Sequence, residues 1–367
     1  MTRLAALRAG LWPRPRSAYN ALLSQWRPVP VQRATVEAVL ARFGLGAPAA
    51  GLRRPLTPVG RSRNVLLESA GRRLVLKQYK ATMRPEGIQY EHAVLRRLAA
   101  VGFPAPQLVA DRAGRTLVTH EERHYALFEC LTGYNAGDYW LSGRRERQLV
   151  EQAGAALAHY HQAVAGFQPD GHKADGLTPA GLWWWQDGAW FRERWDHGAA
   201  ALAAGRFTAA EAHFWRAALP RLRELSATLV ARLAGQAEAL RLAVIHGDYG
   251  PYNLLIDGDG LVAVLDFECV HWNLRVTDLI MALTRFAGTA TGLAVDKAAA
   301  FLRAYAGANP LEPGERALFA DLFALWQLRR LAHYLTETAA DALPTARRTL
   351  AWLEALPPHP ELVHALT

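Results

Sequence analysis

The most constraining feature of this sequence is a polar loop between two short apolar segments. Leu242–Ile245 and Leu254–Ile256 are rich in aliphatic residues and predict two β-strands. The loop between them, residues 246–253, reads His-Gly-Asp-Tyr-Gly-Pro-Tyr-Asn. Because Gly, Pro, Asp and Asn favour turns over strands, the sequence predicts a tight polar loop at the end of the first strand.

A hairpin signal follows this loop directly. The Asp-Gly-Asp-Gly sequence at 257–260 predicts a turn, and Leu261–Phe267 predicts a strand that pairs back on the preceding one. This hairpin would return Asp266 to the same end as Asp248 and Asn253. Carboxylate and amide oxygens suit Mg²⁺, which keeps its other positions for water and phosphate. A remaining carboxylate can accept a proton from a substrate hydroxyl.

The region from 34 to 130 predicts a small, mainly antiparallel β-structure. It contains a short helix at Thr35–Phe43, a hairpin with its turn at Ala70-Gly71 and a longer helix at Glu86–Ala100. The predicted strands are Asn64–Ser69, Arg72–Tyr79, Gln107–Ala110, Thr116–Thr119 and Tyr125–Cys130. Residues 131–367 are mainly helical in pattern apart from the hairpin described above. We therefore expect an α+β protein with a β-rich lobe at 34–130 and a larger helical lobe at 131–367.

The charge distribution separates an N-terminal arm from the rest of the chain. The net charge is +9, but residues 1–60 hold nine arginines and one acid, whereas 241–367 hold ten bases and fourteen acids. Residues 1–33 contain no acid, and we expect a poorly ordered basic arm there. With no recognition motif or stripe of interleaved aromatic and basic residues, the sequence predicts no specific nucleic-acid partner.

Two further classes of protein are excluded by composition. No apolar run is long enough for a membrane-spanning helix, so we expect no membrane partner. The two cysteines, Cys130 and Cys269, are far apart and do not have the spacing of a zinc site or a disulfide framework. These features are typical of a soluble cytoplasmic protein.

The loop and hairpin resemble the catalytic segment of the aminoglycoside phosphotransferase and choline kinase family. Members use His-Gly-Asp-x-x-x-x-Asn where protein kinases use His-Arg-Asp-x-x-x-x-Asn. The resemblance implies a bilobal protein-kinase-like fold and transfer of the γ-phosphate of ATP, with Mg²⁺, to a small-molecule hydroxyl. By this resemblance Asp248 is the catalytic base, Asn253 and Asp266 bind Mg²⁺, and His246 supports the loop. Asp278 matches the buried aspartate that steadies the catalytic loop.

A kinase of this type also needs a lysine for the nucleotide phosphates and an acid to orient it. Lys77 lies in a predicted strand on the same face as Val75 and Tyr79, which is unusual for a solvated charge. Glu91, on the following helix, is its predicted partner, and Glu86 is the alternative. A charged residue that protects an edge strand from aggregation is the other interpretation of Lys77.

The resemblance also implies further nucleotide contacts, at positions where the family places its phosphate loop and its adenine-binding segment. The loop before the first hairpin strand offers Gly60, Ser62 and Asn64 to the phosphates, although it lacks a Gly-x-Gly-x-x-Gly motif. The segment that closes the β-rich lobe would pair with adenine through backbone groups of Glu129 and Leu131.

The acceptor site is expected near Asp248, with Glu268, His271 and Trp272 as candidate contacts. Gly102–Pro106 and Leu157–His161 resemble the homoserine-kinase-like and spore-coat-kinase-like branches of the family. Two alternatives stay open: an inactive pseudokinase or structural coat protein of the same fold, and a protein Ser/Thr kinase. The sequence does not indicate an oligomeric state.

Overall fold

The structure is a computed structural model, and part of the chain is described in it. The described residues are 14–15, 31–48, 54–55, 62–140, 142–170, 173, 176, 181–258, 260–336, 342–355 and 360–366. They combine α-helices with antiparallel sheets, which confirms the predicted mixed fold. Apart from 14–15 and 31–33, the predicted basic arm lies outside the described residues.

Packing divides the chain into two compact units, each made from several segments. Unit 1 contains residues 1–149, 162–173 and 250–270. Unit 2 contains residues 150–161, 174–249 and 271–367. Each unit is described by itself below. The lobe limits at 33/34 and 130/131 remain predictions.

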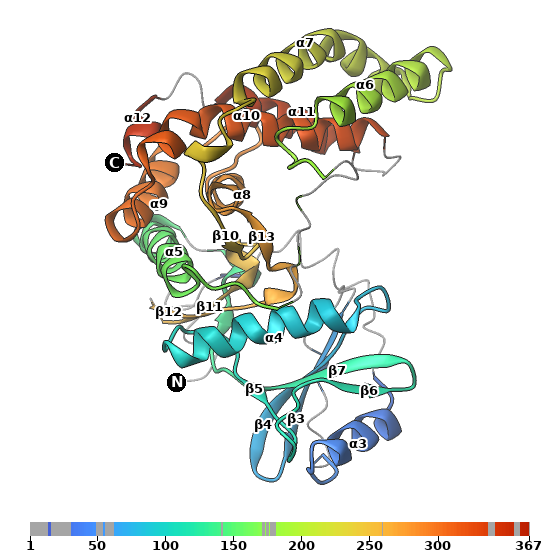
Figure 1. Cartoon of the computed structure of the whole chain (residues 1–367), viewed down its shortest axis with the longest axis vertical. Helices are drawn as coiled ribbons and strands as arrows, with labels where there is room; N and C mark the ends of the chain where they lie inside the picture. The colour runs from blue at the N-terminus through green and yellow to red at the C-terminus, as the bar shows by residue number, and fades with distance from the viewer. Residues whose placement is uncertain are drawn as a thin grey trace. The chain divides into compact units, whose positions relative to one another are not determined.

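The larger sheet of unit 1 is antiparallel and is built around one hairpin (Figure 1). Strand β3 (Arg63–Ser69) pairs with β4 (Arg72–Gln78) across a turn at Ala70 and Gly71, both of which have positive φ angles. This confirms the predicted hairpin. The order continues from β4 to β7 (Arg123–Glu129), which also pairs with β5 (Leu108–Val109) and β6 (Val118–His120). At the other edge β2 (Arg54–Pro55) pairs with β3.

The two faces of strand β4 carry different chemistry because side chains alternate along a strand. Leu74 and Leu76 belong to an apolar core that includes Val36, Val39 and Leu40 of helix α3 (Arg33–Arg42). The side chain of Lys77 lies on the opposite face of the strand from Leu76 and contacts helix α4 (Pro85–Ala100). One sheet therefore separates an apolar core from a charged face that looks toward α4.

A second, three-stranded sheet of unit 1 contains the hairpin that follows the polar loop. Strand β11 (Leu254–Asp257) pairs with β12 (Gly260–Val264) on one side and with β8 (Tyr134–Asn135) on the other. The predicted strand Leu261–Phe267 is therefore wrong beyond Val264. Asp266 has a left-handed backbone with a φ of 59°, and the short helix η4 (Phe267–Cys269) begins directly after it. A left-handed residue cannot continue a strand, so the chain turns at Asp266.

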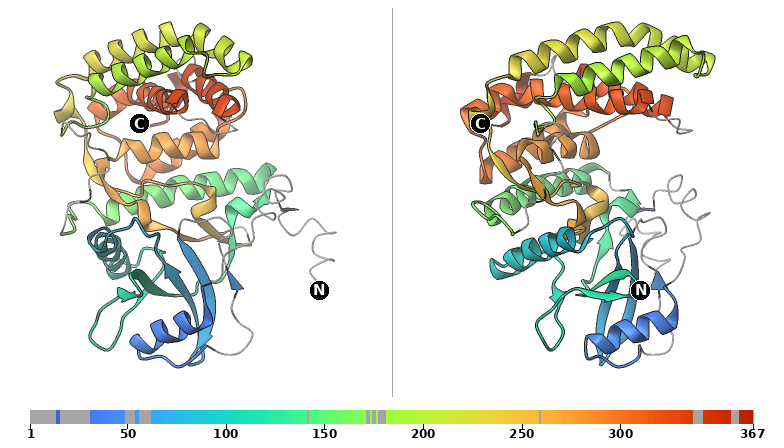
Figure 2. Two further views of the ribbon diagram at one scale, coloured as in Figure 1. Left: turned by 90° about the vertical axis from the view of Figure 1, so that its right-hand side faces the viewer. Right: turned by 45° about the vertical axis from the view of Figure 1, so that its right-hand side comes forward.

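Unit 2 is mainly helical. Helices α6 (Gly188–Ala203) and α7 (Ala209–Leu233) run side by side and pack on α10 (Pro313–Thr336), as Figures 1 and 2 both show. Helix α10 also packs on α8 (Val276–Phe286) and α11 (Ala342–Ala355). The remaining helices are α9 (Val295–Ala308), α12 (Pro360–His364) and the part of α5 (Gly143–Ala163) that belongs to this unit.

A two-stranded sheet in unit 2 supports the polar loop. Strand β10 (Leu242–Ile245) was expected, but its partner β13 (His271–Leu274) was not. The two strands are antiparallel, and Ile245 lies opposite His271. The His-Gly-Asp segment thus leaves a strand that is held on one side by β13.

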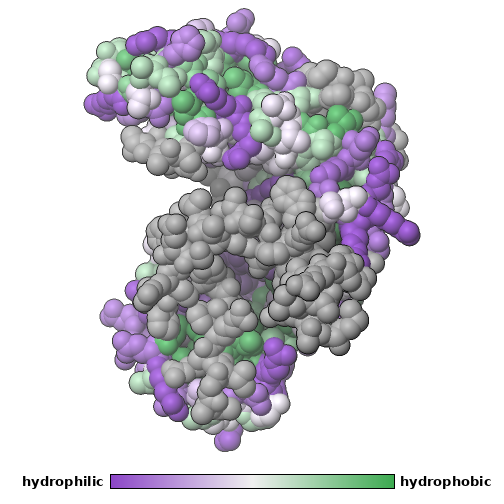
Figure 3. Space-filling view, turned by 180° about the vertical axis from the view of Figure 1, so that it is seen from behind, coloured by the Kyte–Doolittle hydropathy of each residue, from purple (hydrophilic) through white to green (hydrophobic). Residues whose placement is uncertain are grey.

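The described surface mixes polar and apolar residues. Figure 3 shows hydrophilic and hydrophobic residues interspersed on one face. The large hydrophobic residues exposed among those described come from four separate segments, and they are Val101, Leu182, Leu242 and Tyr252. Scattered apolar residues of this kind are ordinary on protein surfaces. None of the described helices combines the length and apolar character needed to cross a bilayer.

Candidate active site

A buried lysine is the centre of the charged face in unit 1. The Lys77 side chain is 7% exposed, and its Nζ lies 3.2 Å from Oε1 of Glu91. Two further carboxylates approach the same nitrogen, from Asp266 at 3.4 Å and from Glu268 at 3.3 Å. The ring of Tyr79 lies 4.8 Å from Nζ. Buried charges need opposite charges and hydrogen bonds around them, and Lys77 has both.

Of the two acids considered for Lys77, Glu91 makes the contact. It is buried on the inner face of α4, whereas Glu86 is exposed in the first turn of the same helix. Burial by itself would lower the pKa of Lys77, but Glu91 and the neighbouring acids outweigh it and hold this pKa well above its ordinary value. The lysine is therefore a fixed positive charge at neutral pH.

Glu268 belongs to the same cluster and bridges two lysines. Its carboxylate lies 3.3 Å from the Nζ of both Lys77 and Lys80, and it accepts a hydrogen bond of 2.6 Å from the hydroxyl of Ser62. Burial alone would raise the pKa of Glu268, but Lys77, the Ser62 hydroxyl and Lys80 hold it below its ordinary value. The sequence prediction had not included Lys80, which is three residues after Lys77 and outside the strand.

The two predicted metal ligands lie side by side at the open end of the β11–β12 hairpin. The amide N–H of Leu265 donates to the carbonyl of Asn253 at 2.8 Å, which places Asp266 beside Asn253. The Asp266 side chain is 47% exposed. Within the described residues, no group of three or more His, Cys, Asp or Glu side chains is arranged to hold a metal.

The charges of this cluster fit a metal with a bound phosphate chain. Three carboxylates face two ammonium groups, so these ion pairs leave one excess negative charge, which favours a cation beside them. One amide and one carboxylate oxygen, with water and phosphate for the remaining positions, is a donor set that suits Mg²⁺.

The predicted nucleotide loop is described only in part. Ser62 is buried and hydrogen-bonds to Glu268, and Asn64 pairs with Lys77 across the β3–β4 ladder. Gly60 lies outside the described residues.

The predicted adenine-binding segment lies at the end of β7. The N–H of Glu129 already donates to the carbonyl of Gln107, and its carboxylate pairs with Arg72. Glu129 can therefore offer adenine only its carbonyl oxygen. Leu131 follows in the loop after the strand, where its carbonyl accepts a bond of 3.5 Å from Sγ of Cys130.

In unit 2 the His-Gly-Asp loop is held by a buried aspartate. Oδ2 of Asp278 accepts from the N–H of His246 at 2.7 Å, and Oδ1 accepts from the N–H of Gly247 at 2.9 Å. The buried His246 ring accepts the N–H of Asp248 at its Nδ1, at 3.2 Å. Asp278 and His246 thus occupy supporting positions around the loop.

Asp278 is supported in turn by a histidine that the sequence did not predict as its partner. Nε2 of His161, on α5, lies 3.0 Å from Oδ2 of Asp278, and Nδ1 lies 2.8 Å from the hydroxyl of Tyr305. Burial would raise the pKa of Asp278, but the bond and charge of His161, with His246 and the Gly247 N–H, hold it below its ordinary value. The carboxylate therefore stays ionised in the interior.

The Asp248 side chain is more open than these supports. It is 30% exposed, and its Oδ1 accepts a hydrogen bond of 2.5 Å from Nη2 of Arg285, on α8. Arg285 was not predicted from the sequence, although it follows Asp278 by seven residues on the same helix. A partly exposed carboxylate on a rigid loop can reach a substrate hydroxyl.

The other candidate acceptor contacts fall in different places. His271 and Trp272 lie on β13 in unit 2, where His271 is hydrogen-bonded to Asn273 at 3.0 Å. Glu268 instead belongs to the lysine cluster of unit 1. The roles of His271 and Trp272 at the acceptor remain predictions.

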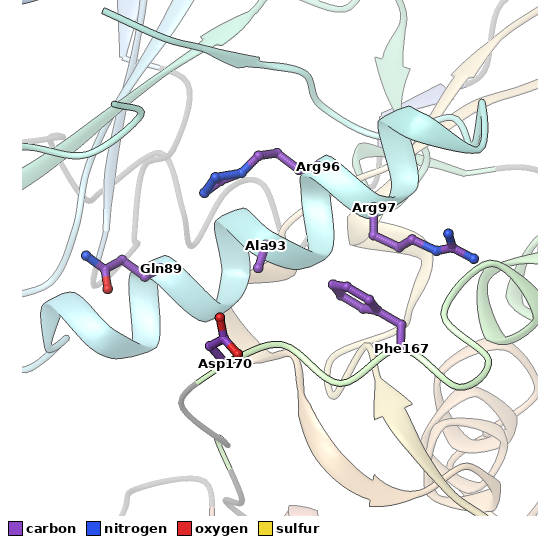
Figure 4. A pocket seen from close by; sticks show the side chains of 6 residues that line it. All are labelled: Gln89, Ala93, Arg96, Arg97, Phe167 and Asp170. Carbon is purple, nitrogen blue, oxygen red and sulfur yellow. The ribbon is translucent and has the colours of Figure 1, made fainter. Parts of the chain in front are cut away.

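A separate pocket of about 490 Å³ lies against α4 in unit 1 (Figure 4). Its lining consists of Gln89, Ala93, Arg96, Arg97, Phe167 and Asp170. None of the predicted site residues lines it. This pocket is therefore separate from the predicted site residues of unit 1.

Comparison with known proteins shows the family of this chain. A sequence profile of the phosphotransferase enzyme family matches residues 55–311. The homoserine kinase of Phenylobacterium zucineum (strain HLK1) is 28% identical over 334 residues, which cover 89% of this chain and 93% of that protein.

Two solved structures with similar folds are small-molecule kinases. A microcompartment-associated aminopropanol kinase has a TM-score of 0.63 at 18% identity, covering 92% of this chain and 99% of that one. An amicoumacin kinase in complex with AMP-PNP and Ca²⁺ has a TM-score of 0.59 at 14% identity, covering 88% of this chain and 93% of that one. These likenesses show a protein-kinase-like fold. Because the family profile spans more than half of the sequence, the chain belongs to the phosphotransferase enzyme family.

Proposed function

We propose that this protein is an ATP-dependent kinase that phosphorylates a hydroxyl group of a small molecule. The observation that carries the proposal is the buried Lys77, with Glu91 at 3.2 Å and Asp266 at 3.4 Å. Kinases of this fold use such a lysine and acid pair for the nucleotide phosphates, and the aspartate for the metal. An edge-strand role would leave Lys77 in solvent, whereas it is buried.

The nucleotide end of the proposed reaction uses residues of unit 1. Lys77, oriented by Glu91, would hold phosphate oxygens, and the carbonyl of Glu129 with backbone groups of Leu131 would hold the base. Asn253 and Asp266 would hold Mg²⁺, which when bound neutralises charge on the phosphates. The amicoumacin kinase complex contains AMP-PNP and Ca²⁺, which supports a nucleotide and a divalent ion as cofactors here.

The acceptor end uses the loop of unit 2. The Asp248 carboxylate would accept the proton of the acceptor hydroxyl as its oxygen bonds to the γ-phosphorus. The bond from that phosphorus to the β–γ bridging oxygen breaks, and ADP leaves with the bridging oxygen. His246 and Asp278 keep the loop in place while the proton moves.

We propose a small amino alcohol as the acceptor, with homoserine as the first compound to test. The support is the relationship to the homoserine kinase of Phenylobacterium zucineum, which extends over 89% of this chain. Homoserine offers a primary hydroxyl for transfer. Location in the cytoplasm stays a prediction.

The proposal is tested by measuring ADP release with ATP, Mg²⁺ and a panel of acceptors. The panel contains homoserine, aminopropanol, choline, an aminoglycoside and a generic protein substrate. We expect turnover with a small hydroxyl compound. In Asp248→Asn the rate should fall about 10²- to 10⁴-fold, because the base is lost.

Asp257→Asn is the matched control, since Asp257 is exposed at the hairpin turn and should keep the wild-type rate. Turnover of the protein substrate alone would favour the protein kinase alternative. If no acceptor stimulates ADP release and Mg-ATP does not raise the melting temperature, the chain is a pseudokinase or structural protein and the proposal is wrong.

A further inference from the structure

Helix α8 presents two residues of opposite charge to the His-Gly-Asp loop. Asp278 lies in its first turn and Arg285 in its last turn. Seven residues correspond to about two turns of an α-helix, so the two side chains lie on the same face. Both contact the segment from His246 to Tyr249.

The contacts of these two residues are complementary. Asp278 accepts the backbone N–H groups of His246 and Gly247, at 2.7 and 2.9 Å. Arg285 donates from Nη2 to Oδ1 of Asp248 at 2.5 Å and from Nη1 to the carbonyl of Tyr249 at 3.0 Å. Four successive residues are thus held by one helix face, the first two by an acid and the next two by a guanidinium group.

The carbonyl that anchors Arg285 is itself fixed. Tyr249 is fully buried, and its hydroxyl donates to the carbonyl of Ala153 at 2.7 Å. Its ring packs against Phe286, the residue after Arg285, with 6.0 Å between ring centroids. Because the guanidinium group is planar and donates from both terminal nitrogens, fixing one contact also fixes the direction of the other.

The surface pair of Arg232 and Asp321 has no such second anchor among the described contacts. Arg232 donates to both oxygens of Asp321, on the surface, with the two side chains 57% and 18% exposed. The described contacts of Arg232 go to that one carboxylate. Such surface pairs contribute little to stability. Arg285 differs because it joins the carboxylate of Asp248 to the backbone of the next residue.

We propose that Arg285 is the positioning residue that sets the orientation of the Asp248 carboxylate for proton transfer. This inference rests on the proposed role of Asp248 as the base. Rotation of a carboxylate moves its oxygens by about 1 Å or more, and misplacement on this scale can lower a rate by about 10²-fold. Arg285 should therefore act on kcat, and the nucleotide residues of unit 1 should be unaffected.

The test compares Arg285→Gln, Arg285→Lys and the control Arg232→Gln in the full chain. The measurements are kcat, KM for ATP and for the acceptor, and melting temperature. In Arg285→Gln we expect kcat to fall about 10- to 100-fold, with KM for ATP within about threefold of wild type. The kcat of Arg285→Lys should lie between those of the wild type and of Arg285→Gln, because an ammonium group keeps the charge but not the planar guanidinium group. Arg232→Gln should keep the wild-type kcat.

A wild-type kcat in Arg285→Gln or in Arg285→Lys contradicts the inference. Equal losses of kcat in both, matched by equal drops in melting temperature, indicate a structural role and also contradict it. If Arg285→Gln does not fold, a lowered kcat at unchanged KM for ATP in Arg285→Lys still supports it. A wild-type chain that turns over no acceptor contradicts the proposed function and this inference together, whereas unchanged variants of an active chain contradict the inference alone.

Discussion

Lys77 in unit 1 and Asp248 in unit 2 are both central to the proposed reaction, but the protein holds them in different ways. The Lys77 side chain is 7% exposed and has three carboxylates within 3.4 Å. Asp248 is 30% exposed and is held by Arg285 and by its own loop. A buried charge is stable only with its partners in place, whereas a partly exposed one can lose a partner to water.

Because of this difference, we expect substitutions at the two residues to affect stability and reaction rate to different extents. The Lys77 cluster draws on a strand, a helix and the segment 266–268, so a change there should affect both nucleotide use and stability. The Asp248 side chain ends at the surface of its unit, so Asp248→Asn should affect the rate with little effect on stability. The predictions below test this contrast.

The largest effect is expected at Lys77. In Lys77→Met, kcat/KM for ATP should fall about 10²- to 10³-fold, because a fixed charge on the phosphates is lost. Stability should fall as well, because Glu91 would be left buried without its partner. Arg73→Met is the matched control, since Arg73 is an exposed cation on the same strand and should change kcat/KM by less than about threefold.

Steady-state kinetics with varied ATP, together with thermal denaturation, check this prediction. Lys77→Arg serves as a second variant if Lys77→Met does not fold, and it should still lose most of its activity because a guanidinium group is larger and planar. Wild-type kcat/KM in either variant would sink the proposed nucleotide role of Lys77.

The next largest effect is expected at Asp278, which anchors the His-Gly-Asp loop of unit 2. Asp278→Asn should lower the free energy of unfolding by about 3 kcal/mol, because an amide NH₂ would face the N–H donors that the carboxylate now accepts. Asp296→Asn, at an exposed position in the first turn of α9, should change it by less than about 0.5 kcal/mol. Urea unfolding followed by tryptophan fluorescence measures both.

Asp278→Asn also sharpens the contrast with Asp248. If Asp248→Asn proved as destabilising as Asp278→Asn, the two carboxylates would not differ as described. Asp278→Asn should lower kcat too, because the loop that carries Asp248 loses its anchor.

The smallest effect, over the measured range from pH 5 to 7, is a pH dependence of the stability of unit 1. Burial, with Arg96 and Lys77 nearby, lowers the pKa of His92 to about 3. The neutral ring bonds to the hydroxyls of Tyr79 and Thr116, at 3.1 and 2.7 Å. Because an unfolded histidine has a pKa of about 6.5, the unfolded chain binds one more proton between pH 3 and 6.5. Stability should therefore fall by about 1.4 kcal/mol per pH unit on acidification through this window.

Urea midpoints at pH 5, 6 and 7 check this slope. His92→Gln should be less stable at pH 7 but should show a shallower fall toward pH 5. Thr116→Val keeps the buried ring, so it should lower the midpoint and retain the slope. An unchanged slope in His92→Gln would show that His92 does not carry this pH dependence.

The pairing of Lys77 with Glu91 could be predicted because it depends on regular spacing. Strand alternation directs Lys77 away from the α3 core, and the helix that follows carries an acid on its buried face. The β3–β4 hairpin was likewise predictable from its turn residues, and the hairpin at 257–260 from its Asp-Gly pairs.

Other features depend on packing that no local pattern records. Strand β13 is four residues long, and only its pairing with β10 makes it a strand. The left-handed turn at Asp266 ended β12 earlier than its apolar residues suggested. The bridge from Glu268 to Lys80 joins residues that are 188 positions apart, and sequence spacing gives no signal for such a contact.

The sequence by itself indicated the mixed fold, because hairpins and helices follow from short-range rules of turns and periodicity. The resemblance of its His-Gly-Asp-x-x-x-x-Asn loop to a known family indicated the family and the candidate site residues. Only the tertiary structure decided which further charges meet: Asp266 and Glu268 beside Lys77, His161 behind Asp278, and Arg285 on Asp248. These contacts join distant segments, and they form because a buried or half-buried charge must find a partner in whatever element packs against it.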